Sequence, residues 1–324
     1  MFEEILPNLY RIEIPLPKSP LKYLNSYLIK GDGRFLIIDT GMNREGCRRQ
    51  LYASLESLNV DLSKTDIFAT HWHADHLGLV ADLATDSSTV YFNRIEAFAL
   101  FDPEEDWEAD MFYYYTLHGF PEEELKKSMA GHPGSLYGLK EKVDFHILQE
   151  GDMLEVGDYS FRCIETSGHS PGHMCLYEAD KKILIAGDHI LFDITPNITS
   201  MLRTKNPLKN YLANLEKVYK LDVSLVLPGH RAISNDHRKR ITELQKHHEN
   251  RMNETLVALE KGAKSAWEVA PYITWDIGFS SWEQFPLVQK MFAFGETLAH
   301  MVCLEEDGRI QSSKDGHKML YSLE

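Results

Sequence analysis

The sequence predicts an α/β protein built from packed layers of sheets and helices. Short apolar runs alternate with helical patterns through the first two-thirds of the 324-residue chain, and such alternation is typical of layered α/β folds. The expected strands are residues 27–29, 35–38, 67–69, 90–92, 161–164, 183–186 and 223–227. Helical patterns fall between some of them, notably at residues 44–58 and 77–84. A hydrophobic content of 43% and a charged content of 26% are those of a globular protein.

Composition and charge argue against several classes of protein. The net charge of −15 gives no overall attraction for a phosphate backbone, so nucleic acid is not the expected partner. No window approaches the ~20 apolar residues that cross a bilayer, and we expect no membrane role. The N-terminus, MFEEILPNLYRIEI, lacks the pattern of a secretory signal, which predicts a cytoplasmic protein. The four scattered cysteines form no CxxC pair and predict reduced thiols rather than a disulfide framework.

Residues 98–139 differ in composition from the segments around them, which predicts an insertion. They are rich in aromatic and acidic side chains, with nine Asp or Glu and no Lys or Arg between Asp102 and Glu124. One interpretation is a solvated helical decoration. The other is a lid over a substrate pocket. The aromatic residues that could line such a pocket are Trp107, Phe112, Tyr113, Tyr114 and Tyr115.

The strand-like pattern stops after His230. Helical patterns cover residues 236–262, 266–272 and 287–306, and a short strand pair, 309–311 with 318–323, follows. Helices followed by a small two-stranded ribbon resemble a winged-helix-like module. Such modules often bind DNA, but this segment has 11 Lys or Arg against 14 Asp or Glu and so lacks a basic footprint. We predict two domains, residues 1–235 and 236–324, with a packing or homodimerisation role for the second.

The stretch THWHADHLG at residues 70–78 concentrates metal-ligand residues between an expected strand and an expected helix. His71 and His73 are two apart and would point the same way in extended backbone. Asp75 and His76 lie at the helix start and would point elsewhere. An isolated histidine is usually structural, but four ligand-type residues within six positions indicate a metal site. This one loop can therefore offer two separate groups of ligands.

Four other expected strands also end in histidine or aspartate. These residues are Asp39 in DTG, His169 and His173 in ETSGHSPGH, Asp188 and His189 in GDH, and His230 in PGH. Strand ends of one sandwich can gather at one edge, where α/β proteins usually place their sites. Neutral imidazoles with a few carboxylates suit zinc, iron or manganese better than calcium or magnesium. A catalytic zinc takes about three protein ligands, so seven good candidates predict two metal ions.

Four motifs follow one another over residues 25–230: HxHxDH, a later lone His, GD and PGH. In this order they resemble the metallo-β-lactamase superfamily, in its hydroxyacylglutathione hydrolase (glyoxalase II)-like branch. The resemblance implies a four-layer αββα sandwich, with the C-terminal winged-helix-like appendage found on some members. It implies that His71, His73 and His169 hold one metal ion, that Asp75, His76 and His230 hold the other, and that Asp188 bridges both. Zinc is the expected metal, with iron or manganese as alternatives.

The resemblance also bears on the residues around the ligands. Asp39 would orient ligands, or it could cap a turn. We expect His173 to be structural, and we assign no role to His189 and Arg231. Superfamily members that reduce oxygen at a diiron site carry glutamate at the position of His73, so histidine favours a hydrolase.

The predicted activity is hydrolysis of an ester, thioester or lactone bond in a small molecule. A hydroxide bridging the two metals would attack the carbonyl, and Asp75 would orient it and pass a proton to the leaving group. The first alternative is a phosphodiesterase or nuclease of the same superfamily, against which the acidic charge argues. The second is a non-catalytic metal-binding or regulatory protein, but structural zinc sites are usually rich in cysteine and these cysteines lie outside the motifs.

Overall fold

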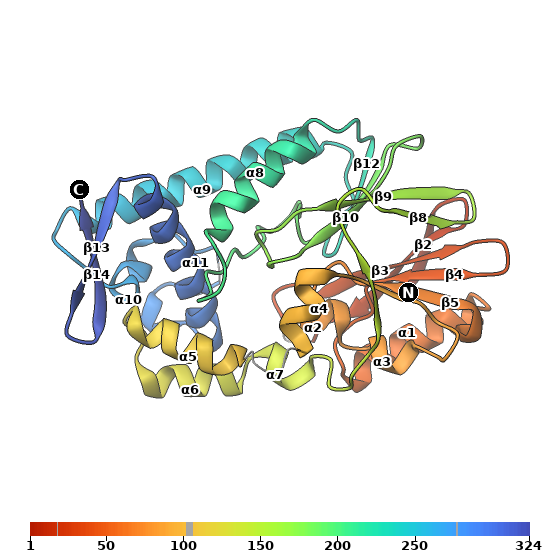
Figure 1. The fold of residues 1–324 in the computed structure, drawn as a ribbon, viewed down its shortest axis with the longest axis horizontal. Helices are drawn as coiled ribbons and strands as arrows, with labels where there is room; N and C mark the ends of the chain where they lie inside the picture. The colour runs from red at the N-terminus through yellow and green to blue at the C-terminus, as the bar shows by residue number, and fades with distance from the viewer. Residues whose placement is uncertain (18, 102–105, 277) are drawn as a thin grey trace.

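Two β-sheets stack face to face, and helices cover their outer faces (Figure 1). The computed structural model describes residues 1–17, 19–101, 106–276 and 278–324. The sandwich lies at the right of Figure 1, and most of the C-terminal helices lie at the left. The layered α/β architecture predicted from the alternation of strands and helices is confirmed.

Within the described residues, the first sheet has seven strands in the order of the chain. They are β1 (Phe2–Leu6), β2 (Leu9–Pro15), β3 (Tyr23–Lys30), β4 (Phe35–Ile38), β5 (Thr65–Phe68), β6 (Val90–Asn93) and β7 (Phe145–Leu148). Strands β1 to β4 pair antiparallel, and β4 to β7 pair parallel. Helix α1 (Glu45–Ser57) crosses over between β4 and β5, so both of these strands point their carboxyl ends toward the same edge.

The second sheet, over the same described part of the chain, has five strands in the order β12-β11-β10-β9-β8. They are β8 (Met153–Val156), β9 (Tyr159–Glu165), β10 (Met174–Glu178), β11 (Ile183–Gly187) and β12 (Leu225–Pro228). The β11–β12 pair is parallel, with helix α8 (Pro207–Tyr219) as its crossover, and the other pairs are antiparallel.

Three apolar layers hold the sandwich together. Between the sheets, Phe68 and Phe161 belong to one fully buried cluster. Outside the first sheet, Leu51 of α1 packs on the strands, and outside the second sheet Tyr211 and Leu215 of α8 do the same. The central strands of each sheet are therefore buried on both faces, which explains why several of them are continuous apolar runs.

The remaining helices form the rest of the molecule. They are α2 (Ala74–Leu77), α3 (Val80–Leu83), α4 (Arg94–Phe101), α5 (Trp107–Leu117), α6 (Glu122–Ala130), α7 (Pro133–Tyr137), α9 (His237–Leu259), α10 (Ala266–Val269) and α11 (Leu287–Glu306), with the 3-10 turns Leu62–Lys64, Ala270–Tyr272 and Trp282–Gln284. The chain ends in a ribbon of β13 (Ile310–Asp315) and β14 (Lys318–Leu323). The helices and ribbon predicted after residue 235 are present, and the likeness to a winged helix stays a prediction.

Helices α5 and α6 of the predicted insertion pack against the C-terminal helices. Tyr115 of α5 and Leu125 of α6 share a buried cluster with Phe294 and Leu298 of α11, and Figure 1 shows these helices together at the left. Residues 102–105 of the insertion lie outside the described residues. The division of the chain at residue 235 stays a prediction.

Several details differ from the expectations. Strands β1, β2, β7, β8 and β10 were not predicted. The single helix expected at residues 77–84 is wrong: α2 ends at Leu77 and α3 begins at Val80, because the backbone leaves the helical conformation at Leu79 (φ −101°, ψ 9°). All four cysteines lie among the described residues and are free and buried. In the described part of the chain, no helix combines the length and apolarity needed to cross a bilayer.

Candidate metal centre

Loops that follow β5, β9, β11 and β12 bring seven histidine and aspartate side chains together at one edge of the sandwich. Within each of three overlapping groups, the potential ligand atoms lie within 4.8 Å of one another. The groups are His71, His73 and His169; His71, His76 and Asp188; and Asp75, His76 and His230. The structure thus gathers all of the residues that the sequence singled out as ligand candidates.

The first group consists of three imidazoles. Nε2 of His71 lies 3.0 Å from Nδ1 of His73, and the ring of His169 lies edge-on to both, at centroid distances of 4.9 and 4.6 Å. His73 has extended backbone and caps α2, so the chain turns immediately after it. The turn brings His76 back beside His71, with ring centroids 4.0 Å apart, so His71 belongs to two of the groups and the two sets of ligands expected from the spacing adjoin one another.

Asp188 lies between the two halves of the site. Its Oδ2 is 3.5 Å from Nε2 of His169 and 3.4 Å from Nε2 of His230, while its Oδ1 is 3.6 Å from Nε2 of His76. On the far side, Oδ2 of Asp75 lies 3.3 Å from Nε2 of His230. One carboxylate therefore faces both histidine groups, which is the arrangement that a ligand shared by two cations requires.

The hydrogen bonds of the histidines show that these residues fit divalent cations. Nδ1 of His76 donates to Asp39, and Nδ1 of His169 and His230 donate to the carbonyl oxygens of Asn197 and Tyr23, each at 2.8 Å. The opposite nitrogen, Nε2, of these three histidines is buried and has no hydrogen-bond partner among the described residues. Metal-binding histidines usually donate their second ring nitrogen to a carboxylate or carbonyl in this way, and buried polar atoms without partners are otherwise rare.

Asp39 holds one side of the site in place. It has a positive φ of 60°, and its carboxylate accepts hydrogen bonds from the Thr70 backbone and from His76, both at 2.8 Å. The Thr70 hydroxyl contacts the same carboxylate and also Nδ1 of His71, at 2.9 Å. Asp39 thus orients His76 directly and His71 through Thr70.

The electrostatics of the cluster favour bound cations. Burial, together with the neighbouring imidazoles, lowers the pKa of His71 and of His73 well below the usual range. Burial alone would raise the pKa of Asp75 and of Asp188, but the nearby histidines outweigh it and lower both values. Burial lowers the pKa of His230, and the two carboxylates beside it outweigh this effect and raise the value to about 10. His71 and His73 are therefore neutral near pH 7 while Asp75 and Asp188 are ionised, as in the donor set that zinc, iron and manganese accept. His230 would have to release its proton to bind a metal ion.

The three other residues near the motifs have different surroundings. His173 contacts the hydroxyl of Thr166 at 2.7 Å through Nδ1 and accepts the backbone N–H of Asp188 at 3.1 Å through Nε2. It therefore holds the backbone of Asp188. His189 is buried against the ring of Tyr211. Arg231 donates to the Pro20 carbonyl at 2.5 Å, and neither of these two residues belongs to the ligand groups found in the described chain.

Glu96 on α4 is a site residue that sequence reasoning missed. Its carboxylate is fully buried and accepts hydrogen bonds from Trp72 N (2.9 Å), Ser170 Oγ (2.5 Å) and Gly172 N (2.7 Å). Burial raises the pKa of Glu96 to about 7, although these hydrogen bonds oppose the shift. Glu96 joins the loop that carries His71 and His73 to the loop that carries His169. A lone glutamate in a helical pattern gave no signal of this role.

A cavity opens beside the metal-ligand cluster. It has a volume of about 370 Å³, and a smaller neighbouring cavity of about 200 Å³ reaches His169. Among the aromatic residues expected to line a pocket, Trp107 is the one that belongs to the described wall of these cavities. The other candidates lie elsewhere: Tyr115 packs on Phe294 in the buried core, Phe112 packs against the same cluster, Tyr114 contacts Ser200, and Tyr113 is exposed. The role of the insertion as a lid stays a prediction.

The fold and this site define a metal-dependent hydrolase. Residues 21–230 match the family model of the metallo-beta-lactamase superfamily, and the chain belongs to that superfamily. Along almost its whole length it is similar to a probable metallo-hydrolase of Bacillus subtilis, with 25% identity over 314 residues that cover 91% of this chain and 92% of that protein.

The chain is also similar to a thioesterase and to a solved structure of the same superfamily. The human acyl-coenzyme A thioesterase MBLAC2 is 28% identical over 222 residues, which cover 64% of this chain and 72% of the thioesterase. The crystal structure of a metallo-beta-lactamase family protein from Thermus thermophilus superposes with a TM-score of 0.83 at 30% identity, covering 99% of this chain and 100% of that one. The C-terminal helices are therefore shared with that solved structure.

Proposed function

We propose that this protein is a dinuclear-metal hydrolase that cleaves an ester, thioester or lactone bond in a small molecule. The position of Asp188 carries the proposal, because its two carboxylate oxygens lie 3.4–3.6 Å from histidines of both groups. In this arrangement, His71, His73 and His169 would hold the first ion, Asp75, His76 and His230 would hold the second, and Asp188 would be shared by both. Zinc suits the donors best, and iron or manganese suits them also.

The chain's own residues would prepare the reaction. Two bound divalent ions would supply Lewis acidity and lower the pKa of a bound water. Asp39 and Glu96 fix the loops that carry the ligands, so the ligand geometry is set before substrate binds. Asp75 is 7% exposed, and one of its oxygens lies in the second histidine group. From there its carboxylate can orient the attacking water and carry the proton to the leaving group.

The surroundings of the site support cleavage of an ester, thioester or lactone bond. The cavity wall near His169 is largely apolar, which suits a carbonyl substrate with an apolar part. The thioesterase named among the relatives supports ester or thioester hydrolysis. Histidine at position 73, in place of the glutamate of oxygen-reducing members, supports the hydrolase branch that includes glyoxalase II-like enzymes.

The test is a substrate panel of thioesters, esters, lactones and phosphodiesters, run on protein whose metal content is measured by elemental analysis. We expect about two metal ions per chain and metal-dependent cleavage of a carbonyl substrate. Asp75→Ala and His71→Ala should lower kcat by orders of magnitude, while Tyr113→Ala, an exposed change on α5, should not. Full activity in either site variant, or cleavage confined to phosphodiesters, would overturn the proposal.

We also propose that residues 236–324 form a winged-helix-like module that serves packing or homodimerisation. The acidic balance of this segment supports a role without nucleic acid. Sedimentation analysis of the full chain tests the dimer, and retention on RNA or DNA columns at low salt tests the alternative. Binding that weakens steeply with salt would favour the nuclease interpretation instead.

A further inference from the structure

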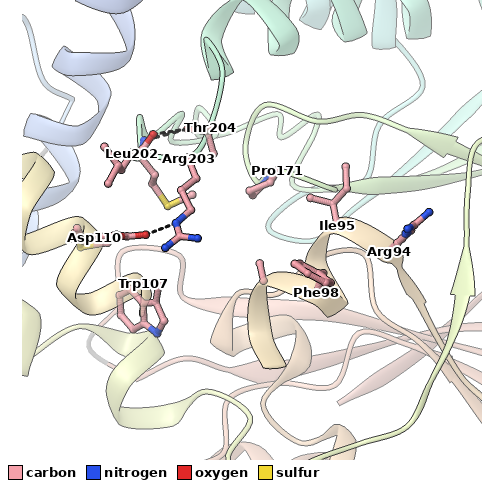
Figure 2. Close-up of a pocket in the computed structure, with 12 residues that line it drawn as sticks. Arg94, Ile95, Phe98, Trp107, Asp110, Pro171, Leu202, Arg203 and Thr204 are labelled. Carbon is pink, nitrogen blue, oxygen red and sulfur yellow. Dashed lines mark hydrogen bonds and ion pairs between the residues drawn. The ribbon is translucent and has the colours of Figure 1, made fainter. Parts of the chain in front are cut away.

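The 370 Å³ cavity has an unusual wall of exposed apolar side chains. Ile95 and Phe98 of α4 are 51% and 61% exposed, and Leu202 in the loop before α8 is 41% exposed. Figure 2 shows the α4 side chains on one side of the cavity and Trp107 with Arg203 on the other. Several large apolar groups around one cavity usually mark a binding surface, because their exposure to water is unfavourable.

This cavity continues toward the metal-ligand cluster. The smaller cavity is lined by His169 and Ser170, and it shares part of its wall with the larger one. The shared residues are Ile95, Pro171, Met201, Arg203 and Thr204. A substrate whose carbonyl lies beside His169 could therefore extend, without leaving the protein surface, as far as Trp107.

The polar side chains of the cavity are arranged to leave an apolar interior. Nε of Arg203 contacts Oδ2 of Asp110 at 2.5 Å, so this pair largely neutralises its own charge. Arg94 extends away from the other labelled side chains in Figure 2. Phe98, Trp107 and Met111 also line the cavity and offer carbon surface to a ligand.

We propose that this cavity is the acyl subsite of the enzyme and that it binds an apolar acyl chain of the substrate. The proposal rests on the proposed function, since it places the acyl carbonyl at the metal-ligand cluster. The combined volume of the two cavities lies in the range of small-molecule sites. Each buried methylene should raise kcat/KM about twofold to fourfold until the cavity is full.

The experiment measures kcat/KM for thioesters of one thiol with acetyl, butyryl, hexanoyl and octanoyl groups. In the parent protein, we expect octanoyl, which has six more methylenes, to exceed acetyl by about 60-fold or more. Phe98→Ala and Leu202→Ala should reduce that ratio, and Ala99→Trp, which fills the cavity, should abolish it. Tyr113→Ala is the matched control, because Tyr113 is also exposed but lies outside the described wall of the cavity.

A binding measurement separates this subsite from the proposed function. Calorimetry should show octanoate binding to the metal-loaded parent about tenfold more tightly than acetate, with the difference reduced in Phe98→Ala. If no thioester, ester or lactone is cleaved, the proposed function fails, while the binding result still decides the subsite. Equal binding of the two acids, or a chain-length dependence that Phe98→Ala and Ala99→Trp leave unchanged, would overturn the subsite.

Discussion

Asn197 links the ligand candidate His169 to the C-terminal helices. Its carbonyl oxygen accepts a hydrogen bond from Nδ1 of His169 at 2.8 Å, and its side-chain amide donates to Glu296 of α11 at 2.8 Å. Glu296 in turn forms a buried ion pair with Arg251 of α9. A continuous set of contacts thus runs from the metal-ligand cluster to the part of the chain after residue 235.

Glu296→Leu should weaken metal binding although Glu296 is not among the proposed ligands. Without its carboxylate, Asn197 loses the contact that fixes the loop, and His169 loses a firmly held partner. Changes of this kind usually lower metal affinity about tenfold or more. Competition with a chelator should show the loss at one of the two ions, and equal weakening at both would contradict the prediction.

The same variant leaves Arg251 buried without its partner, which should cost about 3–5 kcal/mol of unfolding free energy. Arg251→Met combined with Glu296→Leu should regain much of that stability in urea denaturation, but not the metal affinity. The exposed pair Lys246 and Glu249 on α9 is the control, because breaking it should cost less than about 1 kcal/mol.

Single ligand variants should separate the two metal ions. His73→Ala and His230→Ala should each lose about one equivalent after dialysis, since they belong to different ligand groups. Asp188→Ala should weaken both, because its oxygens face both groups. Elemental analysis of the dialysed proteins measures this, and His317→Ala, an exposed change in the terminal ribbon, is the control. Identical losses in the first two variants would argue for a single ion.

Glu96→Ala should lower both stability and kcat. It leaves the donors of Trp72, Ser170 and Gly172 without their acceptor, and each buried donor left unpaired costs about 1–3 kcal/mol. The two loops would then lose their shared anchor, so kcat should fall more than KM rises. Thermal unfolding and steady-state kinetics measure the two effects, with the exposed Glu123→Ala as the control. An unchanged kcat would show that the loops are fixed by other contacts.

The protein should lose stability as the pH falls from about 6.5 toward 4. Burial lowers the pKa of His118 to about 4, so in this range the unfolded chain takes up a proton that the folded chain does not. Above pH 6.5 the group is neutral in both states, and its full effect on acidification is at most about 3 kcal/mol. His118→Asn, which can keep a contact with Tyr321, should flatten the dependence of Tm on pH, whereas His317→Asn should not.

The ligand candidates could be found from the sequence because each of them follows a short apolar run that is typical of a buried strand. HWHADH directly follows β5, and GDH and PGH sit at the ends of β11 and β12. Neighbouring strands of a sandwich place such ends at one edge, so local sequence patterns were sufficient to predict that these residues lie together. Strand β10 was missed because its run, MCLYE, has none of the β-branched residues that mark β11 and ends in the buried Glu178.

Contacts between distant segments could not be predicted. Glu96 and Asn197 act through partners that are 24 to 99 residues away in the chain, and nothing near them in sequence marks these partners. The aromatic run of α5 was informative about burial but not about which rings meet the cavity. That depends on the helix packing against α11, which brings Tyr115 into the core and leaves Trp107 at the cavity.

Because α5, α6 and α11 share one buried core, we expect these helices to unfold locally as a unit. Amide hydrogens of the cavity-forming helix α5 should exchange with solvent in the same cooperative event as those of α11, although the two segments are far apart in the chain. The part of the cavity wall that α5 provides, Trp107, Asp110 and Met111, should therefore be as rigid as the C-terminal helices. Substitutions within α11 can therefore change which substrates fit beside Trp107, although the substituted residues do not contact the substrate. Selectivity can then evolve while the histidine loops stay unchanged.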